Sequence, residues 1–283
     1  MIKANPTIFK FYLSMLDSFS EYLSQKYSES SLDNPDHYKT IIIQKIVRMF
    51  HTLEELVKES KDEVSTRCVL RAILDNVTVF SFIYERDDEE NVLFRHYLYA
   101  LDGLISYKEN VVNGVIEKDG SEIAFSSLCE NVISQIQEKL SSHPYLKVKD
   151  KTIKKIVRNR NWRYWTIQNP RSLSYLDLYI LVGYEEKLAK YYQSHLSQFS
   201  HGLCFSNVLL SDEEMMMKIE LESIPIEERF VKSIVNTFPG EDLKKIYLKS
   251  SFRVNLFKES TIDTNELNEF AKALIDKDRQ LLI

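Results

Sequence analysis

The stretch YLDLYILVGYEEKLAKYYQSHLSQFSHGLCFSN, residues 175–207, joins an aromatic helical pattern to an end rich in serine and histidine. Spacings of four, three and four residues place four of its side chains on one face of a helix: Tyr184, Leu188, Tyr191 and His195. Gly202 is a natural end for this helix because glycine tolerates a left-handed backbone. We therefore expect one helix that packs by its tyrosine face and ends near residue 202.

The polar end of this helix contains Ser197 and His201. A histidine near a helix C-terminus holds a proton favourably beside the negative end of the helix dipole, and its ordinary pKa lies close to neutral. His201 is therefore a candidate acid or base, and Ser197 a candidate ligand contact. The other interpretation is structural, since a histidine among aromatic residues is commonly hydrogen-bonded within the fold. His195 lies on the tyrosine face and is expected in the core.

The composition favours long helices. The 283 residues include only 6 glycines and 6 prolines, the residues that punctuate hairpins and loops. A hydrophobic content of 44% with 28% charged residues is ordinary for a globular protein, and 16 tyrosines with 15 phenylalanines can fill its core. The sequence predicts an all-α fold, a multi-helix bundle of about eight to ten helices.

Proline and glycine pairs predict where the helices begin and end. Asn-Pro pairs at Pro6 and Pro35 are typical helix starts, and His143-Pro144 breaks a helix. Pro225 is expected to separate two helices, the second beginning at Ile226. Residues 113–120 begin with Asn113-Gly114 and end with Asp119-Gly120, two turn-forming pairs. This segment forms either a small hairpin or a loop.

The domain division stays open at this level. Residues 1–209 are expected to form the main helical bundle. Residues 210–283 form a C-terminal helical layer or a small subdomain, unless the whole chain is one continuous domain. We find no repeat of fixed period and no low-complexity linker.

Charge and cysteine usage limit the class of protein. The net charge of −5 gives no overall attraction to nucleic acid or to an anionic membrane, so any such binding must be local. No apolar run approaches the roughly 18 residues of a membrane helix, and residues 1–16 show no long apolar core followed by a small-residue cleavage site, so we expect no cleavable leader. The three widely spaced cysteines predict free thiols in a reducing compartment. A cytoplasmic protein without a membrane role is expected.

The sequence also lacks the motifs of several cofactor and metal sites. Six single glycines cannot build a phosphate loop or a dinucleotide fingerprint, and neither a His-Glu-x-x-His helix nor a Gly-x-Ser-x-Gly elbow occurs. His195, His201 and Cys204 are off helical register with one another, which disfavours zinc. We expect no cofactor and no bound metal.

An arginine line marks the helix expected over residues 65–84. Arg67, Arg71 and Asp75 recur every four residues, and the neighbouring positions are apolar nearly all round. The line therefore points into the protein and needs partners or a function there. The alternative is an Arg71–Asp75 pair on a partly exposed face. Arg71 and Asp75 are candidate catalytic residues, and Arg67 is a candidate ligand contact.

A basic segment, residues 147–163, contains eight lysines and arginines against one aspartate, and Trp162 lies within it. Basic residues interleaved with aromatic ones can hold a phosphate backbone and stack bases. This pattern makes Lys155, Arg158 and Trp162 candidates for binding RNA or a nucleotide. The other interpretation is an ordinary amphipathic helix with a solvated outer face. Two aromatic helices add Arg95 and Tyr192 as further candidate contacts.

Several of these features together resemble an uncharacterised family of bacterial all-helical proteins whose genes are sometimes found near mobile elements and defence genes. The shared features are the arginine line, the aromatic-rich helix expected over residues 92–112, Trp162, Gly183-Tyr184, Tyr191-Tyr192, Ser197 and His201. The resemblance covers residues 42–209. It implies a bacterial helical protein with a link to defence systems.

A more distant similarity is to HEPN helical bundles, many of which are metal-independent ribonucleases or nucleotide-handling partners. Those nucleases use an arginine followed, after four to six residues, by a histidine, and no histidine of this sequence has an arginine at that distance. The similarity therefore implies at most a composite site, in which Arg67 and Arg71 hold a phosphate and His201 acts as acid or base.

Two hypotheses follow for the function. The first is a binding or regulatory protein that holds a protein partner, a second copy of the chain or a nucleotide in an Arg/Asp/His pocket. The second is a metal-independent ribonuclease or toxin with Arg71, Asp75 and His201 at its centre, in which residues 147–163 guide the RNA.

Overall fold

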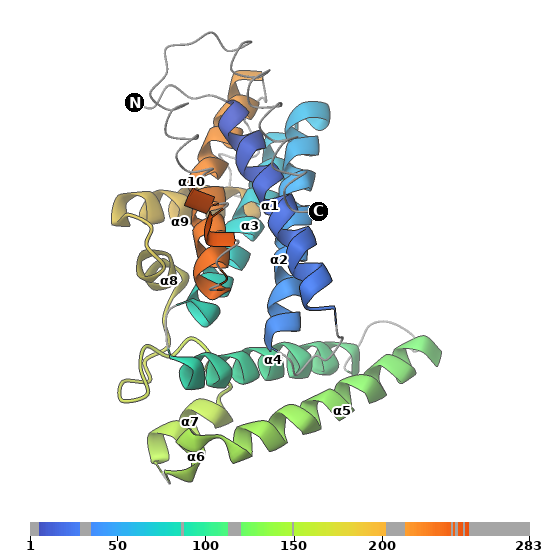
Figure 1. Ribbon diagram of the computed structural model, residues 1–283, viewed down its shortest axis with the longest axis vertical. Helices are drawn as coiled ribbons and strands as arrows, with labels where there is room; N and C mark the ends of the chain where they lie inside the picture. The colour runs from blue at the N-terminus through green and yellow to red at the C-terminus, as the bar shows by residue number, and fades with distance from the viewer. Residues whose placement is uncertain are drawn as a thin grey trace. The chain divides into compact units, whose positions relative to one another are not determined.

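The computed structural model describes residues 6–28, 35–85, 88–112, 120–148, 150–201, 213–238, 240, 243–245 and 247–248. Within these ranges the chain forms ten α-helices and one π-helical turn, η1 (Figure 1). The described ranges contain no strand, only an isolated antiparallel bridge between Tyr164 and Ser172. The predicted all-α fold is confirmed. The predicted hairpin or loop at 113–120 lies almost wholly outside the described residues.

The chain divides into two compact units, both discontinuous in sequence. Unit 1 contains α1 (Pro6–Lys26), α2 (Pro35–Glu55) from residue 39 on, η1 (Leu56–Ser60), α3 (Glu63–Tyr84), the end of α8 (Tyr175–Leu181), α9 (Glu186–Ser200) and α10 (Glu213–Thr237). Unit 2 contains α4 (Glu89–Val112), α5 (Gly120–Ser142), α6 (Pro144–Lys147), α7 (Lys151–Arg158) and the first residues of α2 and α8. The predicted boundary near residue 209 lies outside the described residues.

Local capping explains several helix starts. α1 and α2 begin at prolines, as predicted. The predicted break at His143-Pro144 separates α5 from α6, which begins at Pro144. The Asp62 carboxylate accepts hydrogen bonds from the amides of Val64 and Ser65 at 3.1 and 3.3 Å and so caps α3. His143 caps α6 in the same way, accepting from the amide of Tyr145 at 3.3 Å.

The helix break predicted at Pro225 is wrong, because α10 runs from Glu213 to Thr237 through this proline. Proline removes an intrahelical hydrogen bond, and side chains near it bond to the carbonyl groups of the preceding turn. The hydroxyl of Ser223 donates to the Glu220 carbonyl at 2.6 Å, and the hydroxyl of Tyr192 donates to the Glu222 carbonyl at 2.7 Å. Packing of α10 along both sides of the proline then keeps the helix continuous.

An aromatic cluster forms the centre of unit 1. Phe230 of α10 stacks on Phe50 of α2, with ring centroids 6.5 Å apart, and meets Phe80 of α3 edge-on at 5.6 Å. All three side chains are fully buried. α10 packs against both α1 and α3, and α3 packs against α9. Unit 1 therefore presents the arginine line of α3 to α9 and α10.

The buried face of α9 differs from the predicted one by one position. Ala189, Tyr192, Leu196 and Phe199 are buried, whereas Tyr191 is 39% exposed. His195 is half-buried and stacks on Tyr191, with 4.9 Å between ring centroids. Both sets of positions have helical spacing, so the pattern alone does not distinguish them. The contacts of α9 with α3 decide which face is covered.

Unit 2 is built on α4 and α5, which run side by side (Figure 1). Phe94 of α4 is fully buried and contacts three rings from the following segments: His143, Tyr145 and Tyr164. The short helices α6 and α7 continue from α5 and pack against each other. None of the helices described is both long and apolar enough to cross a membrane.

Candidate functional site

Arg67 lies inside unit 1 and is paired twice. Its Nε donates to Glu63 Oε1 at 2.7 Å and its Nη1 donates to Glu222 Oε2 at 2.5 Å. The side chains of Arg67 and Glu63 are 3% and 1% exposed. Burial opposes the charged guanidinium, but Glu222 and Glu63 outweigh it and raise the pKa of Arg67. Arg67 could bind a ligand only by leaving both carboxylates.

Arg71, one turn further along α3, is half-buried and makes its own set of contacts. Its Nε donates to Asp75 Oδ2 at 3.1 Å and its Nη1 donates to Ser197 Oγ at 3.2 Å. The hydroxyl of Tyr179 donates to Asp75 Oδ1 at 2.5 Å, and the Arg71 guanidinium lies 5.6 Å from the centre of the Tyr179 ring. The structure thus brings Arg71 and Asp75 to Ser197, as a network that joins α3, α8 and α9.

His201 lies at the C-terminal end of α9, where its amide donates to the Ser197 carbonyl at 3.1 Å. Its side chain is exposed. Among the residues that the structure describes, no hydrogen bond or ion pair joins His201 to Arg67, Arg71 or Asp75. His201 is therefore one helical turn from Arg71's partner Ser197 without belonging to the network.

Tyr192 is fully buried, and its hydroxyl donates to a backbone carbonyl of α10. Burial raises the pKa of this phenol, and neighbouring Tyr184 and Glu222 raise it further. His195 shows the opposite shift: burial lowers the pKa of its imidazole, and Arg67 adds to this effect. Tyr192 therefore lies inside the packing between α9 and α10, whereas His195 is half-buried beside the exposed Tyr191.

Arg95 supports a loop of unit 2. Its guanidinium is buried, lies 4.5 Å from the centre of the Tyr164 ring and donates to the carbonyls of Tyr164 and Trp165 at 3.3 and 3.2 Å. Backbone bonds between Trp165 and Arg171 and between Leu173 and Arg163 close the same loop. Arg95 therefore holds a defined turn in place after α7, and this turn carries an exposed tryptophan.

The two tryptophans have different surroundings. Trp162 is 9% exposed and meets Tyr99 edge-on, with ring centroids 5.2 Å apart. Trp165 is 42% exposed, and the guanidinium of Arg171 lies 5.3 Å from its ring centre. The sequence predicted Trp162 as a binding residue, whereas Trp165 and Arg171 were not predicted as contacts. The sequence Trp-Arg-Tyr-Trp at residues 162–165 contained a signal for this difference. In an extended segment alternate side chains point to opposite sides, so Trp162 and Trp165 are expected on different sides.

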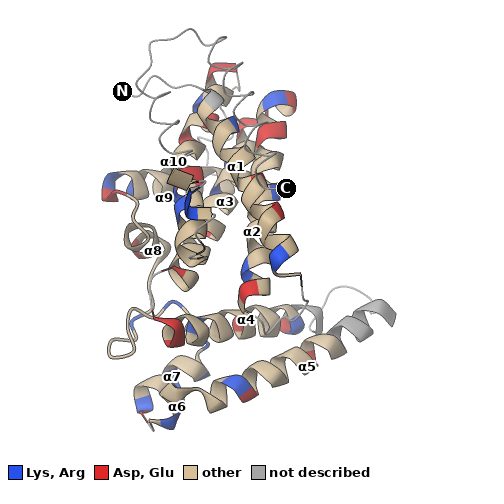
Figure 2. Cartoon of the chain, in the orientation of Figure 1, with Lys and Arg blue, Asp and Glu red and all other residues tan. Residues whose placement is uncertain are grey.

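The basic residues of α7 are exposed. Figure 2 marks the lysines and arginines along the chain in blue. Ile153 and Ile156 are buried and fix the orientation of the helix, as the amphipathic interpretation predicted. The opposite face carries four exposed cations: Lys151, Lys154, Lys155 and Arg158. We call these four residues the basic face. In the described part of the chain none of them forms an ion pair with a carboxylate. Their positive charge is therefore available to an anionic partner.

The described residues contain no group of three or more His, Cys, Asp or Glu side chains placed to hold a metal ion. No protein-family model, no curated protein and no solved structure matches the chain. Two clusters of described residues offer polar groups to a ligand: the Arg71–Asp75–Ser197 network of unit 1 and the basic face of unit 2.

Proposed function

We propose that the protein is a binding component that holds single-stranded RNA on unit 2. The observation that carries this proposal is the basic face of α7, whose four cations lack carboxylate partners among the described residues. Lysine and arginine side chains at such spacing bind phosphates and release counterions, which provides affinity independent of sequence. Because the net charge is −5, attraction to an anion must be local, and the basic face provides such a local surface.

Trp165 provides the second element of the proposed RNA site. It follows the last cation of the basic face by seven residues, on the loop that Arg95 holds in place. An exposed indole offers a stacking surface to any unpaired base, and an adjacent arginine adds to such stacking. Single-stranded nucleic acid is bound by cations that contact its phosphate backbone and by aromatic rings that stack on its bases. The basic face and Trp165 provide one of each. The resemblance to bacterial defence-associated proteins is compatible with this role.

The experiment is a titration of fluorescently labelled single-stranded RNA with the full chain. Replacing Lys151, Lys154 and Lys155 together by glutamine should weaken RNA binding about 100-fold at ~0.1 M salt. Each lost phosphate contact lowers the logarithm of the binding constant by roughly 0.7 at that salt concentration. The matched control replaces three exposed lysines of unit 1, Lys187, Lys190 and Lys218, and changes the net charge equally. An equal loss in the control, or no binding by the wild-type protein, would refute the proposal.

A metal-independent ribonuclease is the second candidate function. The observation that favours it is that α9 brings Ser197 to Arg71 and presents exposed His201 one turn later. In that case Arg71 would hold a phosphate and His201 would transfer a proton. Incubation of labelled RNA with the protein in the presence of a chelator tests this function. Cleavage that is lost in His201→Ala would support it, and absence of cleavage by the wild type would eliminate it.

A further inference from the structure

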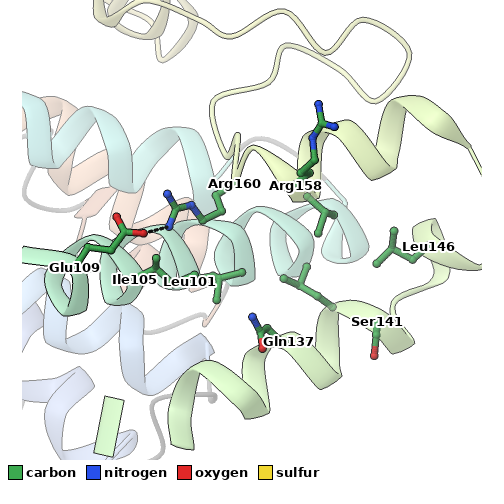
Figure 3. A pocket seen from close by; sticks show the side chains of 10 residues that line it. Leu101, Ile105, Glu109, Gln137, Ser141, Leu146, Arg158 and Arg160 are labelled. Carbon is green, nitrogen blue, oxygen red and sulfur yellow. Dashed lines mark ion pairs between the residues drawn. The ribbon is translucent and has the colours of Figure 1, made fainter. Parts of the chain in front are cut away.

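A cavity of about 570 Å³ lies within unit 2, between α4, α5, α6 and α7 (Figure 3). Its volume falls in the range typical of sites for small organic ligands, roughly 300–1,000 Å³. The central lining is aliphatic and contains no aromatic ring: Leu101, Ile105, Leu140, Leu146 and Val157. A lining of leucine, isoleucine and valine side chains suits a ligand with a hydrocarbon chain better than it suits a ligand with a flat polar ring.

Charged and polar groups lie at the edges of this cavity. Figure 3 shows the Arg160 side chain directed toward Glu109, and the Arg158 guanidinium directed away from the aliphatic lining. Gln137 and Ser141 are exposed along α5. The lining includes two arginines and Glu109, and Asp102 lies beside Arg160 just outside the lining. An anionic group at the rim would therefore bind Arg160 in competition with Asp102 and Glu109.

Arg160 retains much of its capacity to bind. Its ion pairs with Asp102 and Glu109 measure 3.4 and 3.9 Å, longer than the roughly 2.7–2.9 Å of a close charged hydrogen bond. In the described part of the chain its guanidinium donates no hydrogen bond. Its backbone has a φ of +49°, directly after α7, where glycine is normally favoured. An arginine at this position places a long cationic side chain over the cavity.

We propose that this cavity binds a fatty carboxylate, with the hydrocarbon chain between α4 and α5 and the carboxylate at Arg160. The lining residues of α4 extend from Leu101 to Glu109. At a rise of about 1.5 Å per residue this is ~12 Å, the length of a chain of about ten carbons. This binding does not rest on the proposed RNA site, because Arg158, which lines the cavity and belongs to the basic face, directs its guanidinium away from the aliphatic lining.

The test is calorimetric titration of the full chain with sodium octanoate, decanoate and dodecanoate below their micelle concentrations. Affinity should rise about fourfold for each added methylene group until the cavity is full. Decanol, which lacks the charge, should bind at least tenfold more weakly than decanoate. No binding of decanoate, or equal binding of decanol, would overturn the proposal.

Two variants locate the binding. Val157→Phe fills the cavity from α7, and Gln137→Trp blocks it from an exposed position on α5, where the larger side chain does not disturb the core. Each variant should lower decanoate affinity at least tenfold while RNA binding is retained. Lys190→Gln, which removes a charge in unit 1, should leave decanoate affinity unchanged. Unchanged decanoate binding in folded Gln137→Trp would place the ligand elsewhere and refute the assignment.

Discussion

The carboxylate of Glu222 on α10 and the guanidinium of Arg67 on α3 form an ion pair, with 2.5 Å between Oε2 and Nη1. The other oxygen of Glu222 accepts a hydrogen bond from the hydroxyl of Tyr191 at 2.8 Å. One carboxylate thus connects three helices of unit 1, and the guanidinium it binds also holds buried Glu63. Arg67, the first residue of the arginine line, therefore has a structural role in holding α3 to α10.

Replacing Arg67 by methionine should lower the free energy of unfolding by about 3–5 kcal/mol, because it leaves the carboxylates of Glu63 and Glu222 without their cation. Urea denaturation measures the loss. Arg71→Met is the control: water reaches the Arg71 and Asp75 side chains, which are 15% and 27% exposed, so the loss should be less than half as large. Equal losses for the two variants would contradict the structural role assigned to Arg67.

Glu227 of α10 is fully buried, and neither of its carboxyl oxygens has a hydrogen-bond partner among the described residues. Burial raises the pKa of this carboxyl well above its ordinary 4.5, and the nearby carboxylates of Glu220 and Glu54 raise it further. Below pH 4.5 both the folded and the unfolded chain keep the proton. Above it only the unfolded chain ionises, which favours unfolding by about 1.4 kcal/mol per pH unit until the folded pKa is reached.

Glu227→Gln removes this titration. The variant should therefore gain stability over the wild type as pH rises from 5 to 8, with little difference between them at the lower end. Thermal unfolding of both proteins across this pH range measures the difference. The control is Glu228→Gln, since Glu228 is partly exposed and pairs with Lys232. A stability difference that does not change with pH would show that Glu227 is ionised in the folded protein.

Trp165→Ala should weaken RNA binding roughly 5- to 150-fold, the range for loss of one stacked base, without lowering the melting temperature. The chain has only 2 tryptophans, so Trp162→Phe leaves Trp165 as its single indole. In that variant the indole fluorescence should be quenched as RNA saturates the protein. Fluorescence that stays constant through a saturating titration would exclude stacking on Trp165.

The order of helices was predictable because its signals are local. Prolines marked the starts of α1 and α2 and the break between α5 and α6. The break predicted at Pro225 was wrong for the opposite reason. Proline does disfavour a helix locally, but α10 packs against α1 and α3, which are distant in sequence, and this packing keeps the helix continuous.

The candidate site was predictable only in part. The four-residue spacing correctly placed Arg71 beside Asp75. The partner of Arg67, Glu222, lies 155 residues further along the chain, and no local pattern indicates such a pairing. Tyr191 and Tyr192 show the same limit, since adjacent tyrosines fit either face of α9. The choice between them depends on the tertiary contacts of the helix.

The salt dependence of RNA binding tests the central claim most directly. For single strands the logarithm of affinity falls with the logarithm of salt concentration by about 0.7 per phosphate contact, so four cations of α7 predict a slope of about −3 or steeper. Replacing Lys151, Lys154 and Lys155 by glutamine should make this slope shallower by about 2. The lysine variant of unit 1 should keep the wild-type slope. A wild-type slope near zero, or one unchanged by the α7 substitutions, would contradict binding through the basic face.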